Sequence, residues 1–375
     1  MGLAFIGGVV LNAVVLWDAF ETVILPRRVS RRFRLTRLFY RTSWHIWFAL
    51  AALAPRRRRE TLLSFFGPLS LLVLFALWAV GLILGFGLVQ WALKSSLNPG
   101  SETFSTYLYL SGSTFFTLGF GDVVPLDATG RTLAVLESGT GFGFLALVLG
   151  YLPVLYGAFS RREVNISLLD ARAGSPPTAA ELLRRHREDH EEEELRRLLH
   201  EWERWSAELM ESHLSYPVLA YFRSQHDNQS WLAALTAILD ASALVMVWET
   251  GSLERQARLT FAMARHAVVD LAQVFATAPQ QLSSSRLTQE DWERLRQLLG
   301  WTEEAAGRRR PTLDDLARLH AMYEPYVTAL AGYLRLSLPP WAPPPAKKDN
   351  WQTSAWERSA PSPRSCAPPD DDEHA

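Results

Sequence analysis

Long apolar segments without charge dominate the first 160 residues of this chain. Residues 61–93 contain no charged side chain, and residues 132–159 contain only Glu137. An α-helix rises about 1.5 Å per residue, so each segment is long enough to cross the roughly 30 Å hydrocarbon core of a bilayer. We therefore predict two transmembrane helices. The first is expected to span from about Leu69, after an interfacial lead-in at Gly67-Pro68.

The first 26 residues form a third apolar segment. It lacks the basic start and the small-residue cleavage site of a signal peptide, so Met1–Pro26 is predicted to be a transmembrane helix. Asp18 and Glu21 lie three residues apart, on one face of this helix. Two roles stay open for them. They either pair with Arg27, Arg28 or the next helix, or they take part in proton transfer or voltage sensing.

A shorter uncharged segment, Trp44–Pro55, lies between stretches rich in arginine. Leu35–Ala54 contains aromatic residues such as Trp44 and Trp47, which are typical of membrane interfaces, and we interpret it as an amphipathic helix on the cytoplasmic leaflet. The positive-inside rule then places the arginines inside and the N-terminus outside. The alternative is that this segment also spans, which would place the N-terminus inside. The arginines concerned are Arg27, Arg28, Arg31, Arg32, Arg34, Arg37, Arg41, Arg56–Arg59 and Arg161-Arg162.

A short segment between the two long apolar ones carries the most informative pattern. Ser101–Phe116 is predicted to be a half-helix entering the membrane, because Asn98-Pro99-Gly100 breaks the preceding helix and a serine can cap the new one. The sequence Thr117-Leu118-Gly119-Phe120-Gly121-Asp122 follows. Gly119 and Gly121 tolerate positive φ at alternate positions, which a backbone needs to point successive carbonyls the same way. Rings of such carbonyls can replace the hydration shell of a cation.

This hexapeptide resembles the selectivity filter of potassium channels, whose pattern is Thr-Val/Ile-Gly-Tyr/Phe-Gly-Asp. The resemblance extends over roughly Leu69–Phe159 and implies an outer helix, a pore helix, a filter and an inner helix. It also implies that Asp122 lies at the outer mouth of the pore. The K⁺ sites that it implies are formed by the carbonyls of Thr117, Leu118, Gly119 and Phe120, together with the Thr117 hydroxyl.

Three residues depart from the common form of this pattern. Phe120 lacks the tyrosine hydroxyl that can brace a filter against the pore helix. Leu118 is bulkier than Val or Ile, and Phe116, which we expect to support the filter, replaces a common Thr. Looser packing here would relax the selectivity for K⁺ over Na⁺. A weakly selective monovalent cation channel is therefore an alternative.

The second long apolar segment, residues 132–159, contains several glycines. Gly141 lies where many potassium channels keep a hinge glycine, and Pro153 would kink the lower end of the helix. We assign Gly141, Gly150 and Pro153 to a gating hinge, although the glycines equally suit close helix packing. Glu137 is an intramembrane acid, and we expect it to support the filter from behind through a hydrogen bond, or else to face a neighbouring helix.

The second half of the chain is predicted to be an α-helical domain. Trp231–Trp248 is apolar enough to suggest a fourth span, but Asp240 near its centre favours a core helix of a soluble domain. His186 and His190 have the spacing of metal ligands, yet a charge run of this kind is typical of a solvated helix face. The spacings expected at helix N-termini are Thr178…Glu181, Thr288…Asp291 and Thr312…Asp315.

The predicted fold class is an all-α membrane protein with a pore-loop channel fold, an extra N-terminal transmembrane helix and a C-terminal cytoplasmic helical domain. The rest of the chain, from Pro339 on, is expected to be disordered. The expected parts are residues 1–60 (transmembrane and interfacial helices), 61–160 (pore), 161–177 (linker), 178–338 (helical domain) and 339–375 (tail).

These patterns favour a potassium-selective channel subunit in the plasma or cell inner membrane. One filter per chain implies a homotetramer, because a carbonyl ring around an ion needs four contributions. We expect no cofactor besides permeant K⁺, and K⁺ and the bilayer as partners. We expect no nucleic acid, since no basic and aromatic binding motif is present. No catalytic set of residues can be assembled, which argues against an enzyme. A non-conducting scaffold with a channel-like fold is the remaining alternative.

Overall fold

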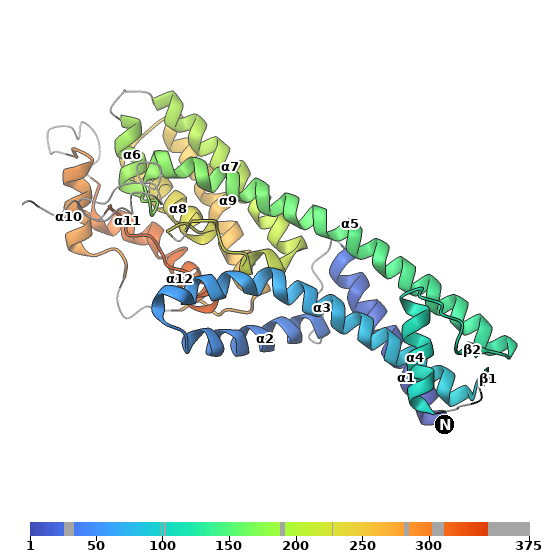
Figure 1. Ribbon diagram of the computed structural model, residues 1–375. Helices are drawn as coiled ribbons and strands as arrows, with labels where there is room; N and C mark the ends of the chain where they lie inside the picture. Colours follow the sequence, from blue (N-terminus) through green and yellow to red (C-terminus); the bar gives the residue numbers. More distant parts are fainter. Residues whose placement is uncertain are drawn as a thin grey trace, which may run out of the picture. The chain divides into compact units, whose positions relative to one another are not determined.

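Most of the described residues lie in helices (Figure 1). The computed structural model describes residues 1–25, 34–98, 100, 103–187, 192–226, 228–280, 285–301 and 311–343. The chain divides into two compact units. We call Met1–Arg162 with Glu208–Ser224 the membrane unit, and Glu163–Ala207 with Gln225–Ala375 the helical unit.

The membrane unit is built around three long helices. Its elements are α1 (Gly2–Ala19) with a π-helical continuation η1 (Phe20–Ile24), α2 (Leu35–Ala52), α3 (Arg56–Leu93), β1 (Leu97–Asn98), α4 (Phe104–Phe115), β2 (Val124–Pro125), the first part of α5 (Ala128–Ala173), the end of α7 (Glu192–Ser215) and the 3₁₀-helix η2 (Pro217–Tyr221). β1 and β2 pair antiparallel, with Leu97 opposite Pro125. This short pairing closes the loop that contains α4 and the residues after it.

Four helices among the described residues are long and apolar enough to cross a membrane: Gly2–Ile24, Arg58–Leu93, Ala128–Ala173 and Trp231–Trp248. The first three coincide with the predicted transmembrane helices. α2 does not meet the same criteria, so the structure gives no support to the alternative in which this segment spans. In the helical unit, α8 (Trp231–Trp248) is buried from Trp231 to Val245. We therefore treat α8 as a core helix of that unit.

The expected lead-in at Gly67-Pro68 is wrong, because α3 is one continuous helix from Arg56 and contains Pro68 in its interior. Packing outweighs the backbone hydrogen bond that the proline removes. The ring of Phe222 lies directly over Gly67, where a Cβ would come within 2.7 Å of it. The Ser70 hydroxyl donates to the Gly67 carbonyl over 2.9 Å. The helix is thus covered at the point where the sequence suggests a break.

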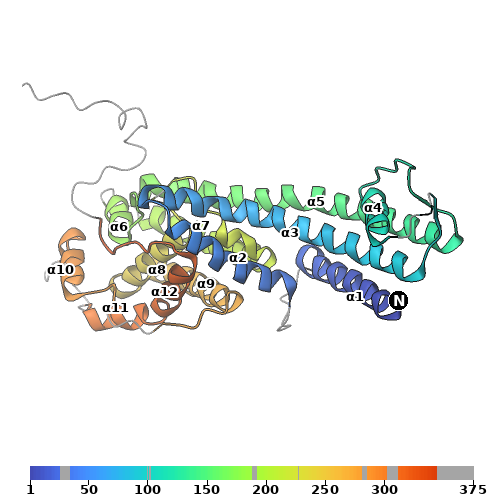
Figure 2. The ribbon, with the colours of Figure 1, turned by 60° about the horizontal axis from the view of Figure 1, so that its bottom comes forward.

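α2 runs alongside the first part of α3 in both views (Figures 1 and 2). The aromatic residues that we expected at a lipid interface contact protein instead. Trp44 is 3% exposed, with its ring 4.8 Å from that of Phe66, and the Trp47 indole donates to the Leu62 carbonyl over 2.9 Å. The face carrying these tryptophans therefore packs against α3, and the interfacial position of α2 stays a prediction.

The boundary between the two units differs from the expected one in two ways. α5 stays helical through Ala173, so most of the expected linker at 161–177 continues the inner helix. Residues 208–224, which we assigned to the helical domain, pack within the membrane unit. Their apolar side chains join the core of the long helices: Val218, Leu219 and Phe222 cluster with Leu74, Phe75, Trp78, Tyr151 and Leu155. Sequence-local patterns cannot show such a long-range insertion.

The helical unit packs further helices around α8. They are α6 (Ala179–Arg187), most of α7, α9 (Ser252–Val274), α10 (Gln289–Leu298), α11 (Leu313–His320) and α12 (Glu324–Leu334). The expected N-caps at Thr288 and Thr312 are confirmed as complete capping boxes with Asp291 and Asp315. At Thr178 only half of the box forms, with the Glu181 amide donating to the threonine hydroxyl over 3.4 Å.

Several expectations fall outside the described residues. These are the expected cap at Ser101, the arginines from 27 to 32, His190 of the suggested metal pair, and the tail beyond residue 343. Among the residues that are described, no cluster of three or more histidine, cysteine or acidic side chains has the geometry to hold a metal.

Candidate functional site

The backbone after α4 alternates between positive and negative φ. Thr117 has φ of 54°, Gly119 of 58° and Gly121 of 77°, whereas Leu118 and Phe120 keep ordinary negative values. Glycine adopts such angles without cost, but threonine does not, and strained backbone of this kind concentrates at functional sites. The alternation that we predicted from Gly119 and Gly121 thus begins two residues earlier, at Thr117.

Backbone hydrogen bonds to the end of α4 hold the start of this segment. The amides of Thr117 and Leu118 donate to the carbonyls of Thr114 and Ser113 over 3.0 and 2.8 Å. Beyond them the side chains are open in the single chain: Leu118 is 57% exposed and Phe120 is 69% exposed. Large exposed apolar side chains are typical of surfaces that protein or membrane covers.

The outer end of the segment is braced by a residue that sequence reasoning missed. The hydroxyl of Tyr109, on α4, donates to Asp122 Oδ2 over 2.8 Å. The other carboxylate oxygen accepts from the Val123 amide over 3.1 Å. Phe120 lacks a hydroxyl, and Tyr109 supplies one from α4. The thirteen-residue separation carries no sequence signal, because it depends on how the loop folds back on α4.

Replacing Tyr109 by phenylalanine is expected to loosen Asp122 without unfolding the protein. Both partners of this hydrogen bond are exposed, so water can replace it and the stability of the fold should not change measurably. We expect the K⁺ over Na⁺ permeability ratio to fall severalfold. The matched control is Tyr107→Phe on the same helix, whose hydroxyl donates to the Ser95 carbonyl. Equal permeability ratios in Tyr109→Phe and wild type would contradict this role.

Glu137 lies behind α4 and is fully buried. It joins three helices: the Gln90 amide of α3 donates to one carboxylate oxygen over 3.2 Å, and the Ser111 hydroxyl of α4 contacts the other. Ser111 is also 2.7 Å from the Ile83 carbonyl. A buried carboxyl group is costly unless it is hydrogen-bonded, and here both oxygens have partners. This geometry fits the expected support of the filter, and that role stays a prediction.

Phe115 and Phe116 differ in burial at the end of α4. Phe116 is 58% exposed in the single chain, and its ring contacts that of Phe115 at 5.3 Å. Phe115 is the buried residue of the two, and its ring packs 5.8 Å from Phe144 of α5. In the single chain, therefore, Phe115 anchors the end of α4, and the supporting role of Phe116 stays a prediction.

Gly141 lets α5 approach the end of α4. A Cβ at this position would lie 1.9 Å from the Phe115 carbonyl oxygen, which favours close packing for this glycine. Gly150 differs, since nothing lies within 4 Å of its Cβ position, and Pro153 is inside the helix. The hinge role of all three residues stays a prediction.

The lower part of α5 is held by an arginine that we had interpreted only as a topology signal. Arg162 is 4% exposed, and its guanidinium donates to the carbonyls of Leu219 and Phe222 over 2.9 and 2.8 Å. It also contacts His213 Nε2 at 3.2 Å. We call these four residues the clasp. It fixes the segment around η2 to the inner helix within the membrane unit.

His213 must be neutral for the clasp to form. Burial lowers its pKa well below the usual value, and the nearby charge of Arg162 lowers it further. Because arginine can only donate, Nε2 is the acceptor, and Nδ1–H then donates to the Leu209 carbonyl over 2.9 Å. The histidine thus links α7 to the inner helix without adding a second positive charge.

Replacing Arg162 by glutamine is expected to free the segment around η2. It leaves the Phe222 carbonyl without its partner, at a cost of about 1–3 kcal/mol. Hydrogen exchange of the amides in residues 216–223 should accelerate roughly tenfold, since each 1.4 kcal/mol is a factor of ten. The neighbouring exposed Arg161 provides the control as Arg161→Gln. Unchanged exchange in Arg162→Gln would show that the clasp does not hold this segment.

A comparison with protein families is consistent with this geometry. Residues 71–155 match a family model described as ion channel. The matched segment, about a quarter of the chain, includes most of α3, α4, the alternating backbone and α5 down to Leu155. No curated protein and no solved structure matches the chain. The family match and the candidate spans support an all-α, membrane-spanning channel protein whose residues 71–155 are similar to the pore of that family.

Proposed function

We propose that this chain is a subunit of a homotetrameric channel that passes K⁺ passively and selectively through a filter formed by Thr117–Asp122. The observation that carries the proposal is the alternation of φ at Thr117, Gly119 and Gly121. Carbonyls aligned by such a backbone replace the hydration shell of a cation without any charged side chain in the lumen. α4 ends directly before the filter, and the partial negative charge of a helix C-terminus favours a cation there.

The exposed side chains of Leu118 and Phe120 support an assembly of four chains. A single chain can supply one side of a carbonyl ring, so a complete ring needs symmetry-related copies. The mass of the detergent-solubilised protein tests this step. Four chains per particle are expected, and a particle of one or two chains would contradict the proposal.

Ion flux into liposomes tests the function itself. We expect liposomes containing the full-length protein to take up K⁺ and not Na⁺ when the two ions have equal gradients. Equal uptake of both ions would favour the second candidate, a weakly selective cation channel. That candidate is favoured by one observation: Phe116 is exposed in the single chain, where a filter of high selectivity needs firm packing.

A further inference from the structure

An elongated groove of about 890 Å³ lies between α1 and the start of α2. From α1 it is lined by Val10, Val14 and Trp17, which share one helix face at spacings of four and three residues. From α2 it is lined by Arg37 and Arg41, which are one turn apart and exposed. The groove thus combines an apolar face from α1 with two cations from α2.

The acidic residues of the groove are already engaged within the protein. Asp18 accepts from the Thr36 hydroxyl over 2.6 Å and from the Trp78 indole over 3.1 Å. Glu21 accepts from the Trp17 indole over 2.7 Å and lies 3.7 Å from the guanidinium of Arg34. Their negative charge therefore stabilises the helix junction. The lining holds two acidic residues, Asp18 and Glu21, and three arginines, Arg34, Arg37 and Arg41, so basic residues outnumber acidic ones.

The charge along the sequence reinforces this excess of basic residues. Between Glu21 and Glu60 the chain contains no acidic residue, while arginine recurs throughout. Guanidinium groups form strong paired hydrogen bonds with phosphate oxygens. Clusters of arginine next to a transmembrane helix attract anionic lipids, by about 1 kcal/mol for each basic residue near the surface. The apolar face belongs to a candidate span, so it lies at the depth of lipid chains.

We infer that this groove binds one anionic phospholipid, with an acyl chain against Val10, Val14 and Trp17 and the phosphate held by Arg37 and Arg41. Neither half of the groove would suffice alone. The arginines give preference for the anionic headgroup, and the α1 face adds affinity for an acyl chain that a free phosphate lacks. The site lies outside residues 71–155 and does not depend on ion conduction.

The test measures bound lipid on the full-length protein in mixed micelles of phosphatidylglycerol and phosphatidylcholine, by native mass spectrometry. Wild type is expected to retain phosphatidylglycerol preferentially. The double variant Arg37→Gln/Arg41→Gln should lose this preference roughly tenfold or more, since two such contacts are removed. Val14→Trp fills the groove at its apolar face without changing charge, and Val14 is 43% exposed, so the helix tolerates it. It should lose the bound lipid as well.

Arg58→Gln is the control, because Arg58 is exposed on α3 and does not line the groove. It should bind phosphatidylglycerol as wild type does. The inference is overturned if wild type binds both lipids equally, if Arg58→Gln weakens binding as much as the double variant, or if Val14→Trp has no effect. Displacement by soluble glycerol phosphate would likewise overturn it, because it would show a simple phosphate site. Unfolding temperature identifies any variant that fails to fold, and Val14→Phe then replaces Val14→Trp.

Discussion

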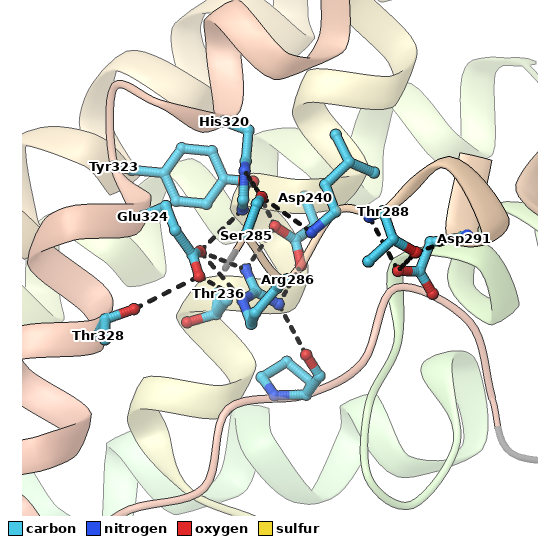
Figure 3. A network of polar contacts seen from close by, with 12 residues as sticks. Thr236, Asp240, Ser285, Arg286, Thr288, Asp291, His320, Tyr323, Glu324 and Thr328 are labelled. Carbon is cyan, nitrogen blue, oxygen red and sulfur yellow. Dashed lines mark hydrogen bonds and ion pairs between the residues drawn. The ribbon is translucent and has the colours of Figure 1, made fainter. Parts of the chain in front are cut away.

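Replacing Arg286 by methionine is expected to lower the free energy of unfolding of the helical unit by about 3–5 kcal/mol, because it leaves two buried carboxylates without their cation. Arg286 lies between Asp240 of α8 and Glu324 of α12 (Figure 3). Its guanidinium is 3.1 Å from Asp240 and 2.9 Å from Glu324, and it also donates to the Pro339 carbonyl over 2.7 Å. Asp240 is fully buried.

The rest of this network explains why the arginine cannot simply be removed. Tyr323 donates to Asp240, and His320 lies 2.8 Å from Glu324. Burial raises the pKa of Glu324, but the hydrogen bond with His320 and the charge of Arg286 outweigh it and lower the pKa to about 2. Glu324 therefore stays ionised at neutral pH, and methionine would leave its charge with a much weaker partner.

Denaturant unfolding of the full-length protein in detergent, followed by tryptophan fluorescence, measures this loss. The control is Arg318→Met, since Arg318 is 72% exposed and pairs with Asp315 at the surface. Surface pairs contribute about 0–1 kcal/mol. If Arg286→Met destabilised the protein no more than Arg318→Met does, the network would not be what holds α8, α12 and the segment at Pro339 together.

Replacing Gly119 by alanine is expected to reduce the K⁺ current at least a hundredfold while the protein still folds and assembles. Nothing lies within 4 Å of a Cβ at this position in the single chain, so the effect is on the backbone itself. Gly119 has φ of 58°, and a left-handed conformation costs an L-residue roughly 1–2 kcal/mol. In the proposed tetramer, each of the four chains would carry this backbone cost. The peptide is then expected to turn and to remove its carbonyl from the ion path.

Single-channel recording of the variant in planar bilayers measures this effect. The matched control is Gly332→Ala in α12, where a Cβ also meets nothing within 4 Å and alanine favours the helix. It should conduct as wild type does. A normal K⁺ current through Gly119→Ala would mean that these carbonyls do not line the ion path.

The sequence was most informative where local chemistry decides the structure. The length of the uncharged segments indicated the helices that could cross a membrane. Thr288 and Thr312 form the capping boxes that their spacing to Asp291 and Asp315 predicts. Gly119 and Gly121 indicated an alternating backbone, because glycine is the residue that such angles favour. The ion-selecting role of these residues stays a prediction, as does potassium specificity.

The features that sequence reasoning missed all depend on contacts between distant residues. Arg162 looked like a flanking charge, yet it is buried against carbonyls more than fifty positions away. The break expected at Gly67-Pro68 does not occur, because Phe222 packs there. Tyr109 reaches Asp122 only after the filter segment folds back on α4. When a residue is buried by partners that are distant in the chain, no periodic pattern in the sequence predicts that burial.

The reversal potential tests the central claim most directly. The full-length protein is placed in a planar bilayer with K⁺ on one side and an equal concentration of Na⁺ on the other. We predict a reversal potential strongly displaced toward the K⁺ equilibrium potential, and loss of the K⁺ current in Gly119→Ala. A reversal potential near zero with robust current would contradict potassium selectivity and assign the chain to weakly selective cation channels.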